Sequence, residues 1–77
     1  MIIFVSDAFV EQYVGGAELT TEAIIEGSFL PCNKILSQQV TIDVMKKYQH
    51  AVWIFGNFTG VNKDCLIYAI KNLNYSV

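Results

Sequence analysis

Two short runs of consecutive apolar residues, at positions 2–5 and 51–55, do most to limit the folds open to this chain. Neither run alternates with polar residues, so each is typical of a strand that is covered on both faces of a parallel sheet. Residues 34–37 predict a second, short strand, and residues 75–77 resemble the start of a further strand. Helical patterns lie between these runs. The order of elements therefore predicts an α/β fold: an incomplete Rossmann-like parallel sheet (βαβαβα) with helices packed on it.

The three predicted helices begin near residues 17, 41 and 62. Thr41 and Asn62 are residue types that accept hydrogen bonds from the first turn of a helix, so we expect both to be N-caps. Along the first helix, glutamates recur every fourth residue and predict its solvent face, while the apolar residues predict its inward face. The predicted solvent face is Glu18, Glu22 and Glu26, and the predicted inward face is Ala17, Leu19, Ala23 and Ile24. The last helix carries an apolar stripe at Leu66, Ala69, Ile70 and Leu73.

The chain of 77 residues is long enough for one small domain, and its 53% content of hydrophobic residues excludes a disordered tail. If the three strands lay in the order 3-2-1, the first two helices would share one face of the sheet. The second face would then be largely bare, and the first strand would have an unpaired edge. Exposed apolar faces and free edges promote association. We therefore expect residues 1–77 to be a truncated N-terminal portion of a Rossmann-like domain.

Charge and cysteine content exclude several classes of function. The net charge is −2, with five lysines and no arginine, so the chain lacks the basic surface of a nucleic-acid-binding protein. Cys32 and Cys65 have neither CxxC spacing nor a neighbouring histidine, which argues against a metal site. No apolar run approaches the length of a membrane span, and no signal peptide is recognisable. We expect a cytoplasmic protein with two reduced thiols.

Three loops are predicted to meet at the carboxyl ends of the strands, where open parallel sheets bind their ligands. These loops are residues 6–16, 37–40 and 56–60. They place seven candidate binding residues at one edge: Asp7, Gly15, Gly16, Ser37, Gln38, Asn57 and Thr59. A structural role is an equally open interpretation for Ser37 and Thr59, which can cap or close turns, and Asn57 is also a common turn residue. The single histidine, His50, falls at the opposite edge.

Gly15 and Gly16 stand immediately before the first helix and predict a cradle for an anion. Glycine lets a backbone come close to a ligand, and the first N–H groups of a helix have no partner within the helix. The alternative is that the two glycines simply let the loop turn into the helix. Nine residues separate Val5 from Gly15, so the dinucleotide motif GxGxxG does not fit, and the Lys-Ser/Thr ending of a P-loop is absent.

The first strand, the long loop and the run Gly15, Gly16, Ala17, Glu18 with an apolar helix behind it resemble the N-terminal domain of GT-B glycosyltransferases of the group 1 type. The resemblance covers residues 1–26. Residues 35–37 and 53–58 are also similar to a subset of these enzymes from viral and bacterial sugar-modification clusters. The resemblance implies a nucleotide-sugar donor as substrate, no separate cofactor, and a glycan or small-molecule acceptor. It also implies that Gly15 and Gly16 approach the donor's diphosphate through their backbone N–H groups.

On the same resemblance, Ser37 and Asn57 line the acceptor side of the cleft. From their loops, we place Asp7 with the donor-phosphate and substrate-binding residues and Thr59 with the acceptor side; no catalytic residue and no metal ligand is identified. The family's C-terminal domain, which holds the sugar nucleotide, lies outside these residues, so we expect this piece to be inactive by itself. The alternative is a non-catalytic, flavodoxin-like α/β module that acts through protein partners.

Overall fold

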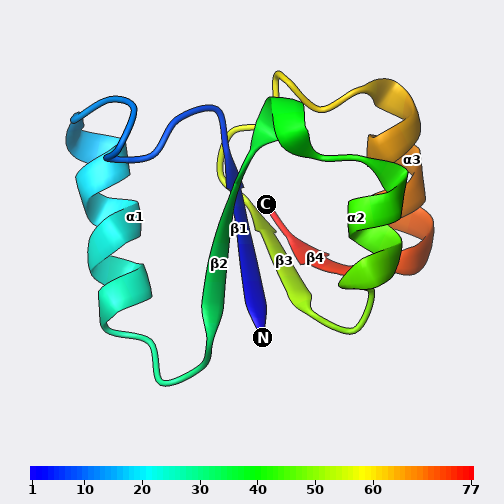
Figure 1. The fold of residues 1–77 in the computed structure, drawn as a ribbon, viewed down its shortest axis with the longest axis horizontal. Helices are drawn as coiled ribbons and strands as arrows, with labels where there is room; N and C mark the ends of the chain where they lie inside the picture. The colour runs from blue at the N-terminus through cyan, green and yellow to red at the C-terminus, as the bar shows by residue number, and fades with distance from the viewer.

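The computed structural model describes residues 1–77 and confirms the predicted α/β class (Figure 1). Four parallel strands form a single sheet: β1 (Ile2–Ser6), β2 (Cys32–Leu36), β3 (Val52–Phe55) and β4 (Asn74–Ser76). The helices are α1 (Gly16–Glu26), α2 (Ile42–Lys47) and α3 (Lys63–Asn72), with a short 3₁₀ turn η1 (Ser37–Gln39) after β2. No helix combines the length and the apolar character that crossing a membrane requires.

The strands lie in the order β2-β1-β3-β4, so the order 3-2-1 considered from the sequence is wrong. β1 is central, and its Ile3 lies beside Asn33 of β2 on one side and Trp53 of β3 on the other. The physical reason is burial: the two uniformly apolar strands pair in the middle of the sheet, where both faces can be covered. β2, which carries Asn33 and Lys34, takes an outer position.

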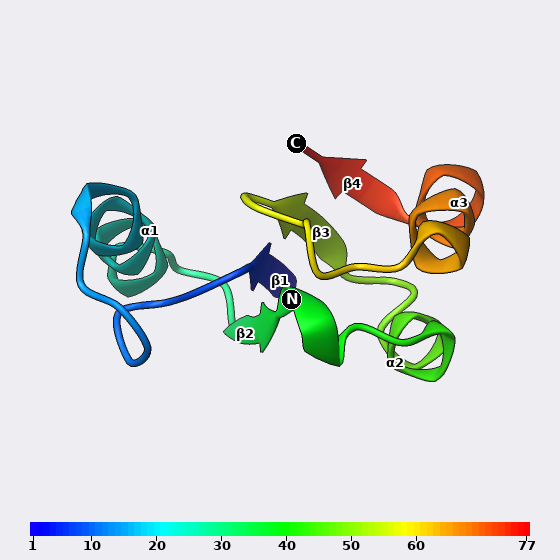
Figure 2. The same cartoon turned by 90° about the horizontal axis from the view of Figure 1, so that it is seen from above.

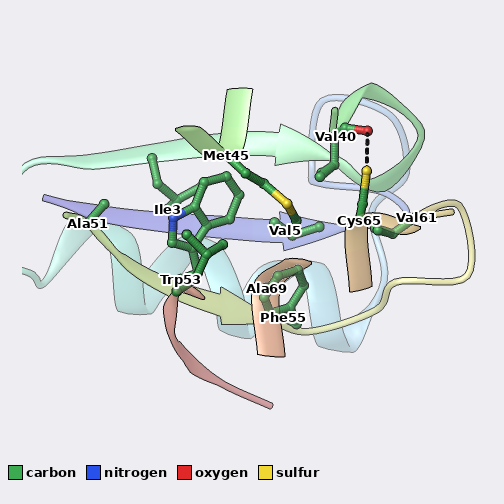
Figure 3. Close-up of a cluster of buried hydrophobic side chains, with 11 residues drawn as sticks. Ile3, Val5, Val40, Met45, Ala51, Trp53, Phe55, Val61, Cys65 and Ala69 are labelled. Carbon is green, nitrogen blue, oxygen red and sulfur yellow. Dashed lines mark hydrogen bonds between the residues drawn. The ribbon is translucent and has the colours of Figure 1, made fainter. Parts of the chain in front are cut away.

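This strand order sends the connecting helices to opposite faces, with α1 on one face and α2 and α3 on the other (Figure 2). The main core lies between the sheet and the α2–α3 face. There Ile3, Val5 and Trp53 pack against Met45 of α2 and Cys65 of α3 (Figure 3). Trp53 is fully buried, and its indole N–H donates to the carbonyl of Tyr48 at 3.0 Å. The one polar atom of this side chain therefore has a hydrogen-bond partner within the core.

The inward face predicted for α1 is wrong. Leu19 and Ile24 are 54% and 56% exposed, and no residue of α1 is fully buried. The half-buried positions are instead Glu18, Thr21, Glu22 and Ile25, which recur at helical spacing on one face.

An ion pair accounts for this rotation of α1. Lys34 projects from β2 and binds Glu22 of α1 at 3.0 Å as well as Glu11 of the preceding loop. Its ammonium group also lies 5.6 Å from the centre of the Phe9 ring. These carboxylates raise the pKa of Lys34, and Lys34 in turn lowers the pKa of Glu11. Glu18 and Glu22 therefore lie on the sheet-facing side of α1, where the sequence predicted its solvent side, whereas Glu26 is exposed as predicted.

The other two helices begin as predicted. The Thr41 hydroxyl accepts from the backbone N–H of Val44, and the Asn62 side chain accepts from that of Cys65 at 3.0 Å. In α3, the stripe is confirmed at Ala69 and Leu73, which are buried, and at Leu66, which is half-buried. The stripe is wrong at Ile70, which is 64% exposed, whereas Cys65, which the stripe did not include, is buried. Both cysteines are free thiols.

Candidate functional site

The strand order creates a switch point between β1 and β3. The chain leaves β1 toward α1 on one face of the sheet and leaves β3 toward α3 on the other (Figure 2). In open α/β sheets, the crevice outside the carboxyl ends of two such strands is the usual ligand site. A cavity of about 130 Å³ lies at this place, lined by Ser6, Ala17, Glu18, Thr21, Gly56 and Asn57. We call it the switch-point cavity.

The N-terminus of α1 opens beside this cavity. Gly15 is the N-cap in an extended conformation, and no side chain caps the helix. The Gly15 carbonyl accepts the first helical hydrogen bond, from Leu19 at 3.0 Å. The first N–H groups of α1 are therefore free of protein partners and available to a ligand, as the sequence predicts for an anion cradle.

The two glycines of this turn have different surroundings. A methyl group on Gly15 would come within 2.5 Å of the Glu18 carboxylate and 2.7 Å of the Tyr13 ring. A methyl group on Gly16 would meet nothing within 4 Å. The atoms near Gly15 are the ends of two side chains that can move, whereas the space at Gly16 is open and leaves room for a ligand to approach the backbone.

The polar groups of the switch-point cavity are largely uncommitted. Ser6 is only 8% exposed, yet its hydroxyl makes no hydrogen bond within the protein. Because no fully enclosed polar side-chain atom lacks a partner, the Ser6 hydroxyl is not fully enclosed, and Ser6 is one of the residues that line the cavity. Glu18 and Asn57 make no side-chain hydrogen bond or ion pair, whereas the Thr21 hydroxyl donates to the carbonyl of Ala17 at 3.0 Å.

Three of the predicted site residues form a separate cluster, which we call the loop clamp: Asp7, Ser37 and Thr59. The Ser37 hydroxyl donates to Asp7 Oδ1 at 2.5 Å and the Thr59 hydroxyl to Asp7 Oδ2 at 2.7 Å. These two hydrogen bonds, together with backbone N–H groups of Thr59 and Gly60, lower the pKa of Asp7. The loop clamp joins the segments that follow β1, β2 and β3, so one carboxylate fixes the carboxyl edge of the sheet.

Gly60 allows the loop clamp to close. A methyl group at this position would lie 2.5 Å from Ser37 Oγ and 2.9 Å from the backbone nitrogen of Gln38. No other residue type fits such an approach without a shift of the backbone. Ser37 beneath it is 1% exposed.

The predicted residues thus fall into two groups. Asn57 lines the switch-point cavity, and Gly15 and Gly16 lie next to it at the start of α1. Ser37 and Thr59 are each hydrogen-bonded to Asp7, so both have a structural role, but it is a bond to a distant carboxylate and not the capping or closing of a turn. Gln38 is exposed on η1. His50 lies at the other end of the sheet, in a hollow with Met1 and Lys47.

Sequence reasoning missed Ser6, Thr21 and the role of Glu18 in the cavity. Ser6 carries a usable signal, since it is the first polar residue after an apolar strand and still belongs to β1. Glu18 and Thr21 could be found only by knowing which face of α1 meets the sheet. No three His, Cys, Asp or Glu side chains gather in a way that would hold a metal ion.

Comparison of this chain with protein-family models, with curated proteins and with solved structures finds no significant match. The function must therefore be argued from the fold and from the chemistry of the residues at the switch point. The fold indicates where a site would lie, and the chemistry of the lining residues indicates which class of ligand could bind there.

Proposed function

We propose that this chain is part of a nucleotide-sugar glycosyltransferase and contributes the glycine loop and the acceptor side of its cleft. The observation that carries the proposal is the uncapped N-terminus of α1, with Gly15 and Gly16, beside a polar cavity at the switch point. Free N–H groups at a helix start bind phosphate groups through hydrogen bonds and the helix dipole. The resemblance of residues 1–26 to group 1 GT-B enzymes supplies the reaction class. We place this transferase in the cytoplasm, in keeping with two unpaired thiols.

The chemistry proposed for this segment is electrostatic. Transfer of the sugar leaves negative charge on the departing diphosphate, and preorganised donors aimed at that charge lower the barrier. Gly15 and Gly16 provide such donors without a side chain in the way. The switch-point cavity, at about 130 Å³, is smaller than the roughly 300–1,000 Å³ of ordinary ligand pockets. Its size suits a cleft whose other wall, and the residues that hold the nucleotide, come from a second domain.

A titration monitored by ¹H–¹⁵N spectra tests the proposal on this chain. Nucleoside diphosphates and pyrophosphate should shift the amide peaks of Gly15, Gly16 and Ala17, with weak affinity because one domain is present. Gly16→Ala should abolish these shifts, since its methyl group enters the space reserved for the ligand but touches nothing in the protein. Gly27→Ala, at the other end of α1, is the matched control and should bind normally. Absence of shifts, or normal binding by Gly16→Ala, would overturn the proposal.

The second candidate is a non-catalytic, flavodoxin-like module that acts through protein partners. The order β2-β1-β3-β4 favours it, because it equals the first four positions of the flavodoxin-like order 2-1-3-4-5. In that case Gly15 and Gly16 serve only the turn into α1. A cooperatively folded chain whose spectrum responds to no nucleotide or diphosphate would favour this second candidate.

A further inference from the structure

The side of α1 that faces away from the sheet is uncharged, largely apolar and uncovered. The half-buried residues of this helix all lie on its sheet-facing side, and no other element lies beyond the helix (Figure 1 and Figure 2). We call the exposed side, together with the C-cap residue, the outer face of α1: Gly16, Leu19, Thr20, Ala23, Ile24 and Gly27. A surface helix normally turns its apolar stripe inward, and an exposed apolar patch marks an interaction site.

The outer face of α1 has a central row of small residues with a bulky residue on each side. The row, at helical spacing, is Gly16, Thr20, Ala23 and Gly27, and the flanking residues are Leu19 and Ile24. The distance between two packed helices depends on the side chains at their contact, so this row lets a second helix come close. The Thr20 hydroxyl already donates to the Gly16 carbonyl at 2.9 Å, so covering the face leaves no hydroxyl proton unpaired.

The outer face of α1 has the same pattern when the helix is read from either end. The midpoint lies between Thr21 and Glu22, and about it the matching positions are Gly16 with Gly27, Thr20 with Ala23, and Leu19 with Ile24. Two exposed apolar residues, Val14 and Phe29, stand at equal distances beyond the two ends. A two-fold axis through the midpoint makes two copies antiparallel and requires this property, because each position must then match its counterpart in the other copy.

The charges of α1 favour an antiparallel pair of these helices over a parallel pair. The helix has no capping side chain at its N-terminus, no basic residue in its last turn, and an exposed Glu26 that makes no ion pair. In an antiparallel pair, Glu26 lies level with Ala17 of the partner subunit, in a first turn whose free N–H groups carry partial positive charge. In a parallel pair, the glutamates of the two copies would lie level with one another and repel.

We infer that the outer face of α1 binds a second copy of this chain, in an isologous dimer whose two α1 helices pack antiparallel. With Val14 and Phe29, the face offers eight residues, fewer than the roughly 20–30 on each side of a standard interface. The dimer is therefore weak, with a dissociation constant of roughly 10 µM to 1 mM. Dimerisation through this face needs no ligand and is separate from the proposed function.

Sedimentation equilibrium of the full chain, from about 10 µM to about 1 mM, measures this association. The data should fit a monomer–dimer equilibrium without larger species, because an isologous contact closes on itself. Over the same concentrations, ¹H–¹⁵N spectra should show shifts at Leu19, Ala23 and Ile24 and none in α3. Added salt should weaken the dimer, since it screens Glu26 from the partner's helix N-terminus.

Two variants test the contact itself, and a third is their control. Ala23→Glu places a carboxylate in the central row near the two-fold axis, where the like charges of two copies meet, so the dissociation constant should rise more than about tenfold. Ala23 is exposed, so the spectrum of this variant should match that of dilute wild type. Glu26→Gln removes the attraction to the helix dipole twice in each dimer and should raise the constant about three- to tenfold. Ile70→Glu puts the same charge at an exposed apolar position of α3 and should dimerise as the wild type does.

A chain that stays monomeric up to about 1 mM overturns the inference. A dimer that survives Ala23→Glu, or that is lost in Ile70→Glu, overturns it as well, because the contact then lies elsewhere. Vesicles of uncharged phosphatidylcholine are the last probe: a monomeric chain whose α1 peaks respond to them would assign the face to lipid. None of the variants changes Gly15 or Gly16, so failure to dimerise and failure to bind a diphosphate are distinguished.

Discussion

Replacing Gly60 by alanine tests how closely the loop after β3 must pack on η1. The new methyl carbon would lie 2.5 Å from Ser37 Oγ, 2.9 Å from the Gln38 nitrogen and 3.3 Å from the Ser37 carbonyl carbon. Two of these three atoms are backbone, and the hydroxyl cannot swing away without losing its bond to Asp7. The loop therefore has to move. Forcing extra atoms into a close-packed site costs about 1–3 kcal/mol.

Thermal or urea unfolding of Gly60→Ala measures this cost. For a domain of this size, each kcal/mol of lost stability lowers the melting midpoint by about 4–8 °C. Gly16→Ala is the matched comparison, since its methyl group meets nothing within 4 Å and its backbone dihedral needs no glycine. The free energy of unfolding of that variant should rise by about 0.4–1 kcal/mol, because alanine reduces the entropy of the unfolded chain. A Gly60→Ala protein as stable as the wild type, or equal losses in both variants, would refute the packing argument.

Three other predictions follow from the hydrogen bonds of Asp7, the ion pairs of Lys34 and the two thiols. The pKa of Asp7 is lowered, so its contribution to stability is fully present above about pH 4 and is lost as the pH falls through the folded-state pKa. The difference in free energy of unfolding between the wild type and Asp7→Asn should therefore shrink when unfolding is measured at lower pH. Lys34→Met should speed amide hydrogen exchange in α1 but not in α3, because α1 has no buried residue and is tied to the sheet by Lys34; unchanged exchange in α1 would argue against this tie. Burial raises the pKa of Cys65, so a thiol reagent at pH 8 should modify Cys32 much faster, and comparable rates would show that Cys65 is accessible.

The candidate site was only partly predictable. The strands alone predict where the carboxyl edge of a parallel sheet lies, and they placed Gly15, Gly16 and Asn57 at that edge, where the structure also has them. The loop clamp did not follow, because Asp7 is 30 residues from Ser37 and 52 residues from Thr59 along the chain. No local pattern distinguishes a carboxylate that binds two loop hydroxyls from one that faces a ligand. The same holds for Ser6, whose unpaired hydroxyl becomes visible only when its neighbours are placed.

The sequence by itself determined the elements and their parallel arrangement. Runs of apolar residues marked β1 and β3, and Thr41 and Asn62 marked the starts of α2 and α3, because these signals depend on residues close together in the chain. Tertiary structure alone decided the strand order and the rotation of α1. The first depends on which strands can be covered on both faces. The second depends on Lys34 of β2, which reaches Glu22 and turns the glutamate side of α1 toward the sheet. Together they place Glu18 in the switch-point cavity.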